Sequence, residues 1–158
     1  MFDTSTIPAS GPAVRSFATS VIVATDPQSA WSDWASSEAL VKWWPAPETN
    51  IDLRVGGSFE ILFSTDGPEG ERGSEGCRYL SYVPGEMISF TWNAPPHLAL
   101  RSSNTWVVIT FKETAHGTEV RLVHTGFLEG SDWDAYMDYF RSAWEQVLDL
   151  HRGYRSAG

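Results

Sequence analysis

Residues 131–152 limit the possible folds more than any other stretch of this chain. Apolar side chains recur there every three or four residues, which collects them on one face of an α-helix. These positions are Trp133, Tyr136, Met137, Phe140, Ala143, Trp144, Val147 and Leu148. Ser131 is a good N-cap, and Gly153 predicts the end of the helix. A stripe so rich in aromatic rings needs a large, concave apolar surface opposite it.

The segments before this helix have the pattern of short strands joined by tight turns. Seven strands are predicted, at residues 15–24, 51–54, 58–64, 76–83, 86–92, 105–112 and 118–124. Connections this short join antiparallel neighbours, so we expect one strongly curved sheet of about six to seven strands. Two short helices follow the first strand, the first capped by Asp26 with Pro27 at its first position, the second capped at Ser36 or Ser37. The expected fold class is α+β.

Composition and charge narrow the class of protein. A chain of 158 residues predicts one domain, placed at residues 14–153 between a flexible N-terminal tail, 1–13, and a C-terminal tail, 154–158. The formal charge of -9, with scattered Arg and Lys, argues against nucleic acid and anionic membrane surfaces as partners. The single Cys77 has no partner for an intrachain disulfide, and neither a signal peptide nor a membrane-spanning run is apparent. We therefore expect a cytoplasmic protein.

Several runs of the sequence resemble the START-like (SRPBCC) superfamily, in the branch related to the activator of the Hsp90 ATPase. They are LVKWWPAP at 40–47, DLRVGGSF at 52–59, PGEMISFTW at 84–92, GTEVRLVHTGF at 117–127 and AWEQVLDL at 143–150. The resemblance covers residues 15–151 and implies a helix-grip fold, in which a curved sheet wraps around the long C-terminal helix. Superfamily members hold lipids, hormones or polyketides between sheet and helix, and some are cyclases. The co-chaperone members also carry a separate N-terminal Hsp90-binding domain, so an Hsp90-type partner is a secondary expectation.

We therefore predict that the chain binds a small hydrophobic or amphipathic molecule between sheet and helix. The candidate ligand-binding residues are mainly large and apolar: Trp43, Trp44, Phe59, Ile61, Phe63, Tyr79, Trp92, Trp106, His124, Met137, Phe140 and Trp144. The same rings also fit a solid core, so both interpretations stay open. Leu98 and Leu100, in the loop that Pro95 begins, are candidates for a lid or a homodimer contact.

His124 is the polar residue with the most interesting place in the pattern. It continues the alternation of Val120 and Leu122, which puts it on their apolar face. There it is either a core histidine with satisfied nitrogens or a group that orients a ligand carbonyl or hydroxyl. Other polar candidates are Arg54, Glu60, Glu75, Arg78 and Tyr79, of which Arg78 and Tyr79 must point to opposite faces.

The motifs of common enzyme classes are missing from the sequence. It has no phosphate-binding Gly-rich loop, no nucleophile elbow and no pair of His residues at metal-binding spacing. We expect no metal, no cofactor and no assigned catalytic residue, and we interpret Cys77 as a small strand residue. The alternative is an enzyme of cyclase or isomerase type that uses the same cavity, with His124 or a buried carboxylate as its base.

Overall fold

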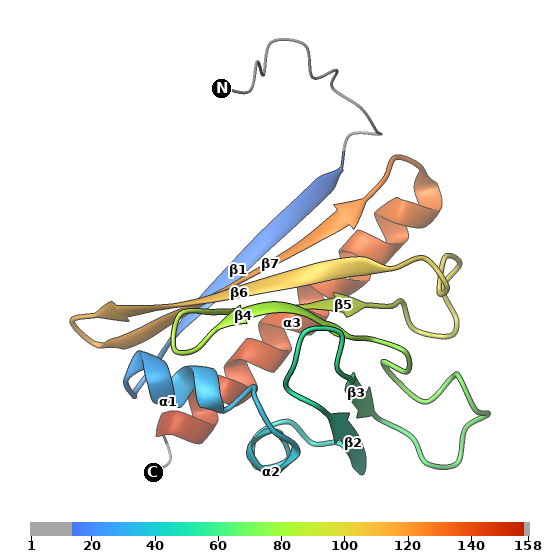
Figure 1. Ribbon diagram of the computed structural model, residues 1–158. Coiled ribbons are helices and arrows are strands. Elements are labelled where there is room, and N and C mark those ends of the chain that lie inside the picture. The colour runs from blue at the N-terminus through green and yellow to red at the C-terminus, as the bar shows by residue number, and fades with distance from the viewer. Residues whose placement is uncertain (1–13, 157–158) are drawn as a thin grey trace, which may run out of the picture.

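The computed structural model describes residues 14–156, which form seven strands and three helices (Figure 1). The elements are β1 Arg15–Val23, α1 Pro27–Ser32, α2 Ser37–Leu40, β2 Glu48–Ile51, β3 Phe59–Leu62, β4 Tyr79–Val83, β5 Met87–Trp92, β6 Thr105–Thr114, β7 Gly117–Phe127 and α3 Ser131–Ser156. The predicted tail at residues 1–13 lies outside the described part of the chain.

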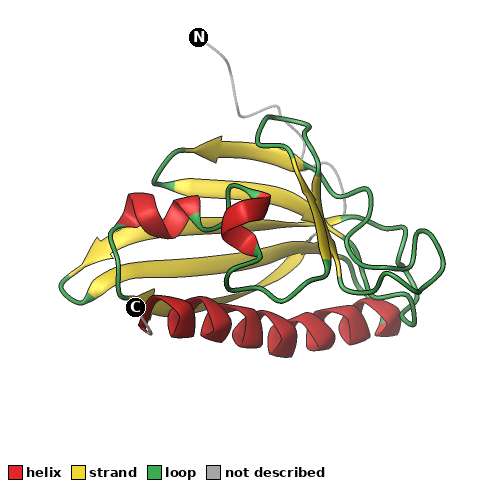
Figure 2. Cartoon of the chain, turned by 90° about the horizontal axis from the view of Figure 1, so that it is seen from below, coloured by secondary structure: helices red, strands yellow, loops and turns green. Residues whose placement is uncertain are grey.

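The strands belong to two sheets rather than to the one sheet of about six to seven strands that the turns predicted. Five strands form an antiparallel sheet in the order β1-β7-β6-β5-β4, and β2 pairs with β3. Phe59 N–H donates to Cys77 O (2.9 Å) and Tyr79 N–H to Gly57 O (2.9 Å), which joins the two sheets by backbone bonds without a continuous ladder. The predicted α+β class and helix-grip arrangement are confirmed, because α3 runs along one face of the curved larger sheet (Figures 1 and 2).

One row of residues crosses the inner face of the larger sheet and shows how α3 is seated. Phe17 pairs with His124, His124 with Val107, Val107 with Phe90, and Phe90 with Tyr79. All five side chains are buried. The predicted stripe of α3 covers this layer, with Tyr136, Met137, Phe140, Trp144 and Leu148 buried. The core therefore lies between the sheet and the helix, as the periodicity indicated.

The two short helices begin at the predicted caps. The Asp26 side chain accepts from Ser29 N–H (2.9 Å), and Ser36 Oγ accepts from Ala39 N–H (3.2 Å). Each side chain satisfies a helix-terminal N–H that has no partner inside its own helix. These caps orient the segment that delivers Trp44 to the side of α3.

The strand predicted at residues 51–54 is misplaced, because β2 ends at Ile51. The chain turns immediately afterwards, with Arg54 N–H donating to Asp52 O (2.9 Å) and Gly57 N–H to Arg54 O (2.8 Å). A Cβ at Gly57 would overlap the carbonyl oxygen of Asp52. Only glycine allows so close an approach, which is why the chain turns here instead of forming the predicted strand.

The prediction that α3 ends at Gly153, with a tail from residue 154, is wrong, because the helix continues to Ser156. The final turn is held by Arg155, whose Nε donates to Asp33 Oδ2 (2.7 Å) and whose NH2 donates to Asp33 Oδ1 (2.6 Å). Tyr154 also packs against the core. These contacts outweigh the cost of about 1 kcal/mol for a glycine inside a helix.

Candidate functional site

Two adjoining pockets follow one side of α3, and we call them together the α3 groove. The first, of about 290 Å³, is the polar pocket, lined by Phe63, Ser64, Glu71, Arg72, Gly73, Ser74, Trp92, Asn93, Ala94, Pro95, Pro96, Arg101, Tyr139 and Phe140. The second, of about 370 Å³, is the apolar pocket, lined by Trp44, Pro45, Phe63, Trp92, Tyr139, Phe140, Ala143, Trp144, Gln146, Val147 and Leu150. Their shared residues, Phe63, Trp92, Tyr139 and Phe140, make them one continuous feature.

Aromatic rings from separate parts of the chain line the groove. Trp44 follows α2 and leaves helical geometry before Pro45, Phe63 follows β3, Trp92 ends β5, and Trp144 lies on α3. The Trp92 ring centroid lies 5.0 Å from that of Trp144 and 6.0 Å from that of Trp44. Trp44 in turn lies 6.1 Å from Phe63. These spacings are within the range of favourable aromatic contacts, so the rings support one another as a wall.

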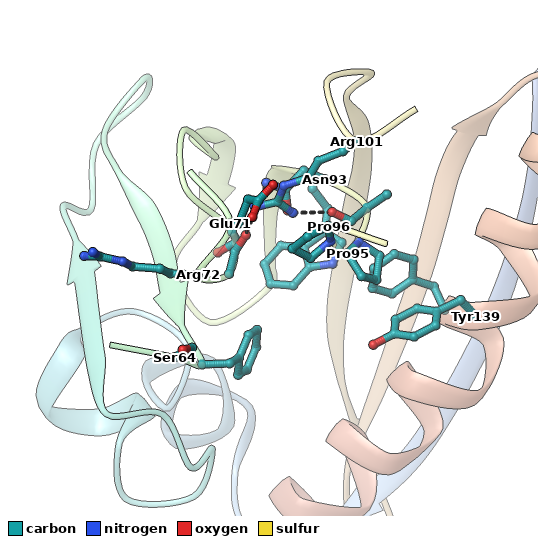
Figure 3. Close-up of a pocket in the computed structure, with 14 residues that line it drawn as sticks. Ser64, Glu71, Arg72, Asn93, Pro95, Pro96, Arg101 and Tyr139 are labelled. Carbon is teal, nitrogen blue, oxygen red and sulfur yellow. Dashed lines mark hydrogen bonds between the residues drawn. The ribbon is translucent and has the colours of Figure 1, made fainter. Parts of the chain in front are cut away.

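The groove opens to solvent beside α3 and is not sealed beneath it. Phe63 is 49% exposed, Tyr139 43% and Leu150 42%, and all three line the groove. Figure 3 shows Tyr139 projecting from α3 toward the loops of the polar pocket. A ligand would therefore reach the rings from the side, between α3 and the segments after β3 and β5.

The charged side chains of the polar pocket are largely committed to its loops. The guanidinium of Arg101 donates to the backbone carbonyls of Gly70, Gly73 and Ala94. Arg72 Nε donates to Gly67 O (2.8 Å), and its side chain points away from Pro95, Pro96 and Tyr139 in Figure 3. These bonds stabilise the loops that form the wall of the pocket.

Trp92 is the unusual member of the wall. Its side chain is only 4% exposed, and it lines both pockets. Over residues 14–156, its indole Nε1 is the one buried side-chain nitrogen or oxygen that has no hydrogen-bond partner. A buried donor of this kind is costly unless something accepts its proton.

His124 lies in a closed hydrogen-bond network in the core and does not itself line the groove. Its Nδ1 accepts from the indole of Trp144 (3.0 Å), which can only donate, so Nε2 carries the proton and donates to Thr105 Oγ1 (2.6 Å). Thr105 Oγ1 donates to Trp92 O (3.0 Å), and the Tyr136 hydroxyl donates to the same oxygen (3.1 Å). Burial lowers the pKa of His124 to about 3 and keeps the ring neutral. This geometry therefore favours the interpretation of His124 as a core histidine whose two nitrogens are both hydrogen-bonded. Its partners are the side chains of Thr105 and Trp144.

The structure separates the twelve candidate residues into three groups. Those that line the groove are Trp44, Phe63, Trp92, Phe140 and Trp144. Those buried in the packed core, outside the groove lining, are Trp43, Phe59, Ile61, Tyr79, His124 and Met137. Trp106 is 37% exposed, whereas its neighbour Val107 is fully buried on the inner face, so Trp106 faces away from the helix.

The other polar candidates serve the scaffold. Tyr79 points inward and its hydroxyl donates to Trp34 O (3.1 Å), whereas the exposed Arg78 donates to Ser58 Oγ (3.1 Å), which confirms their opposite directions. Glu60 accepts from Gly76 N–H (2.7 Å), Glu75 accepts from Arg72 N–H (2.6 Å), and Arg54 pairs with Asp52 (2.6 Å). Each of these contacts fixes a turn or loop.

Cys77 and possible metal sites add no chemistry to the groove. Burial raises the pKa of the Cys77 thiol to about 12, so the reactive thiolate is not formed near neutral pH. Across the described residues, no group of three or more His, Cys, Asp or Glu side chains is placed to hold a metal ion. None of the helices in residues 14–156 combines the length and apolar character needed to cross a membrane.

The sequence analysis missed a buried cluster at the end of α3 and several residues of the groove. His151 Nε2 donates to Asp33 Oδ2 (2.8 Å), and the indole of Trp34 donates to His151 Nδ1 (3.4 Å). A signal was present, since His151 continues the stripe one turn after Leu148. The groove residues Tyr139 and Leu150 lie outside that stripe, so periodicity could not identify them.

The family model described as "Activator of Hsp90 ATPase homolog 1-like protein" matches residues 24–150. No curated protein sequence matches. A solved structure of a Mesorhizobium loti protein has 18% identity and a TM-score of 0.70, covering 89% of this chain and 96% of that one. The Aha1 dimer from Colwellia psychrerythraea has 16% identity and a TM-score of 0.65, with the same coverage of 89% and 96%.

Proposed function

This chain belongs to the activator of Hsp90 ATPase homolog 1-like family, within the START-like superfamily, and we propose that it binds a small hydrophobic or amphipathic molecule in the α3 groove. The observation that carries the proposal is the pair of connected pockets whose common wall contains Phe63, Trp92 and Phe140. Rings held this way offer apolar area without losing conformational freedom on binding.

The size of the groove suits a compact ligand. Pockets of about 290 and 370 Å³ lie within the range of small-molecule sites in proteins. Burying roughly 300 Å² of apolar ligand surface would contribute about 7 kcal/mol before the entropic costs of association. Apolar contact therefore supplies enough free energy to hold a ligand, and polar groups need only orient it.

We do not extend the proposal to catalysis or to a chaperone partner. The base suggested by the sequence, His124, uses both ring nitrogens in the core network and does not line the groove. The Colwellia structure is similar in fold, and its identity of 16% carries no partner over to this chain. Ligand binding rests on features of the groove itself.

Native mass spectrometry of protein purified from its own host tests the proposal, with a variant that fills the groove. Ala143 lines the apolar pocket, so Ala143→Phe places a ring where the ligand would lie. Glu145→Phe adds a ring to an exposed position on the opposite side of α3 and serves as the matched control. We expect a retained small molecule in the wild type and in Glu145→Phe, and its loss from Ala143→Phe. Retention in Ala143→Phe, or a wild type without any bound molecule, would contradict the proposal.

A further inference from the structure

We infer that the ligand carries a neutral hydrogen-bond acceptor, such as a carbonyl or ether oxygen, that accepts the indole proton of Trp92. The inference rests on the proposed function and specifies the class of ligand for the same groove. It assigns Trp92 a positioning role in addition to its contribution to the aromatic wall.

The first support is the contrast between Trp92 and the other buried indoles. Trp31 donates to Met87 O (2.8 Å) and Trp43 to Asp33 O (2.9 Å). Trp34 and Trp144 donate to the buried histidines. The interior thus supplies an acceptor to each of these indoles, and within the described chain the Trp92 N–H is the exception. An indole nitrogen can only donate, so its missing partner must be an acceptor.

The second support is the position of Trp92 along the groove. The Trp92 side chain lines both pockets and so lies where they meet, whereas its Nε1 is covered, so an acceptor reaches it only when a neighbouring side chain shifts. On one side the lining includes Val147 and Leu150, and on the other it includes Ser64 and Asn93. An acceptor at this junction would connect an apolar body, seated beside α3, to a more polar end near the loops. A ketone, ester or ether between a ring system and a polar group has this arrangement.

The third support concerns charge. A buried carboxylate needs a compensating cation, because removing an ionised group from water is expensive. Arg101, a cation in the polar pocket, already lies 3.6 Å from the Glu75 carboxylate and donates to three backbone carbonyls. The other cation, Arg72, donates to Gly67 O, and the carboxylate of Glu71 also lines this pocket. The indole of Trp92 is itself a single neutral donor. These groups favour a neutral acceptor over an anionic one.

A pair of probes that differ only in one carbonyl group isolates this hydrogen bond. 2-Acetylnaphthalene presents a carbonyl oxygen, whereas 2-ethylnaphthalene replaces that group with hydrocarbon. Their dissociation constants would be measured by equilibrium dialysis with the wild type, Trp92→Phe and Trp133→Phe. Trp92→Phe keeps an aromatic ring but removes the N–H, and Trp133→Phe makes the same exchange outside the groove lining. We expect Trp92→Phe to raise the dissociation constant of 2-acetylnaphthalene about 5- to 10-fold more than that of 2-ethylnaphthalene. Trp133→Phe should change neither dissociation constant.

The outcomes separate this inference from the proposed function. If Trp92→Phe weakens both probes equally, Trp92 only shapes the wall, and the inference falls while ligand binding stands. If the wild type binds neither probe, both ideas fail for ligands of this kind.

A second measurement on the wild type does not depend on any variant folding. In nitrogen-15 NMR spectra, the assigned indole resonance of Trp92 should move downfield in proton shift with the acetyl probe and much less with the ethyl probe. Equal shifts would overturn the inference.

Discussion

The core network around His124 and the α3 groove share two residues, Trp92 and Trp144, and the polar groups of Trp92 differ in whether they are paired. Its carbonyl oxygen accepts from Thr105 (3.0 Å) and from Tyr136 (3.1 Å) inside the core. Its indole lines the groove, where the described residues supply no acceptor. The indole of Trp144 also lines the groove but is paired with His124. The unpaired donor is therefore particular to Trp92 and not a property of every groove residue.

The Asp33 cluster at the other end of α3 is a second closed network and extends the comparison. Burial by itself would raise the pKa of Asp33, but hydrogen bonds from His151 and Arg155 more than offset this and hold the pKa below its usual value. Asp33 is thus charged and fully engaged. Substitutions in the closed networks should therefore lower the free energy of unfolding, whereas substitutions in the groove should mainly affect ligand binding.

The largest expected effect is that of Asp33→Ala. Removing this carboxylate leaves His151 and Arg155 without their acceptor, so the free energy of unfolding at pH 7 should fall by about 3 kcal/mol. Urea denaturation measures the change. Asp149→Ala, which breaks the exposed pair with Arg152, is the control and should cost at most about 0.5 kcal/mol. Similar losses for both variants would show that the buried cluster is not special.

The next effect is the pH dependence that His124 imposes. Its pKa is 6.5 in the usual reference state and about 3 in the fold, so between these values the unfolded chain binds a proton that the folded chain excludes. Stability should therefore decrease as the pH falls, by up to about 1.4 kcal/mol per pH unit, or roughly 2.3 kcal/mol from pH 6.5 to 4.5.

His124→Gln identifies the source of that slope, because an amide can also donate and accept but does not titrate. Urea denaturation at several pH values should give a clearly flatter profile for this variant. The lowered pKa of Asp33 acts in a different window, since its stabilisation is present above its usual pKa of 3.8 and is lost only below it. An unchanged slope in His124→Gln would contradict the assignment.

The smallest expected effect is the difference in the free energy of unfolding between two variants of neighbouring indoles, Trp144→Phe and Trp92→Phe. Trp144→Phe leaves His124 Nδ1 without its donor and should lower the free energy of unfolding by about 2 kcal/mol. Trp92→Phe removes a donor that no protein group accepts, so we expect a loss smaller by about 1 kcal/mol or more. Thermal unfolding monitored by circular dichroism compares the two. Equal losses would remove the distinction between closed core and groove.

Much of the fold was predictable from local patterns. The stripe on α3, the caps at Asp26 and Ser36 and the opposite directions of Arg78 and Tyr79 follow from spacing and side-chain chemistry. The error at residues 51–54 came from a local turn at Gly57, and the error at the end of α3 came from a long-range contact. Gly153 stays helical because Arg155 reaches Asp33, a residue distant in sequence.

The groove was only partly predictable, because periodicity identifies apolar faces but not the gaps between them. Trp43 and Trp44 are adjacent, yet Trp43 packs into the core and Trp44 lines the apolar pocket. The local sequence indicates that both rings are buried, because removing apolar surface from water is favourable. Which ring meets a filled space depends on how separate segments pack against α3. That packing is set by contacts such as Asp33 with His151, 118 residues apart, which no short window of sequence contains.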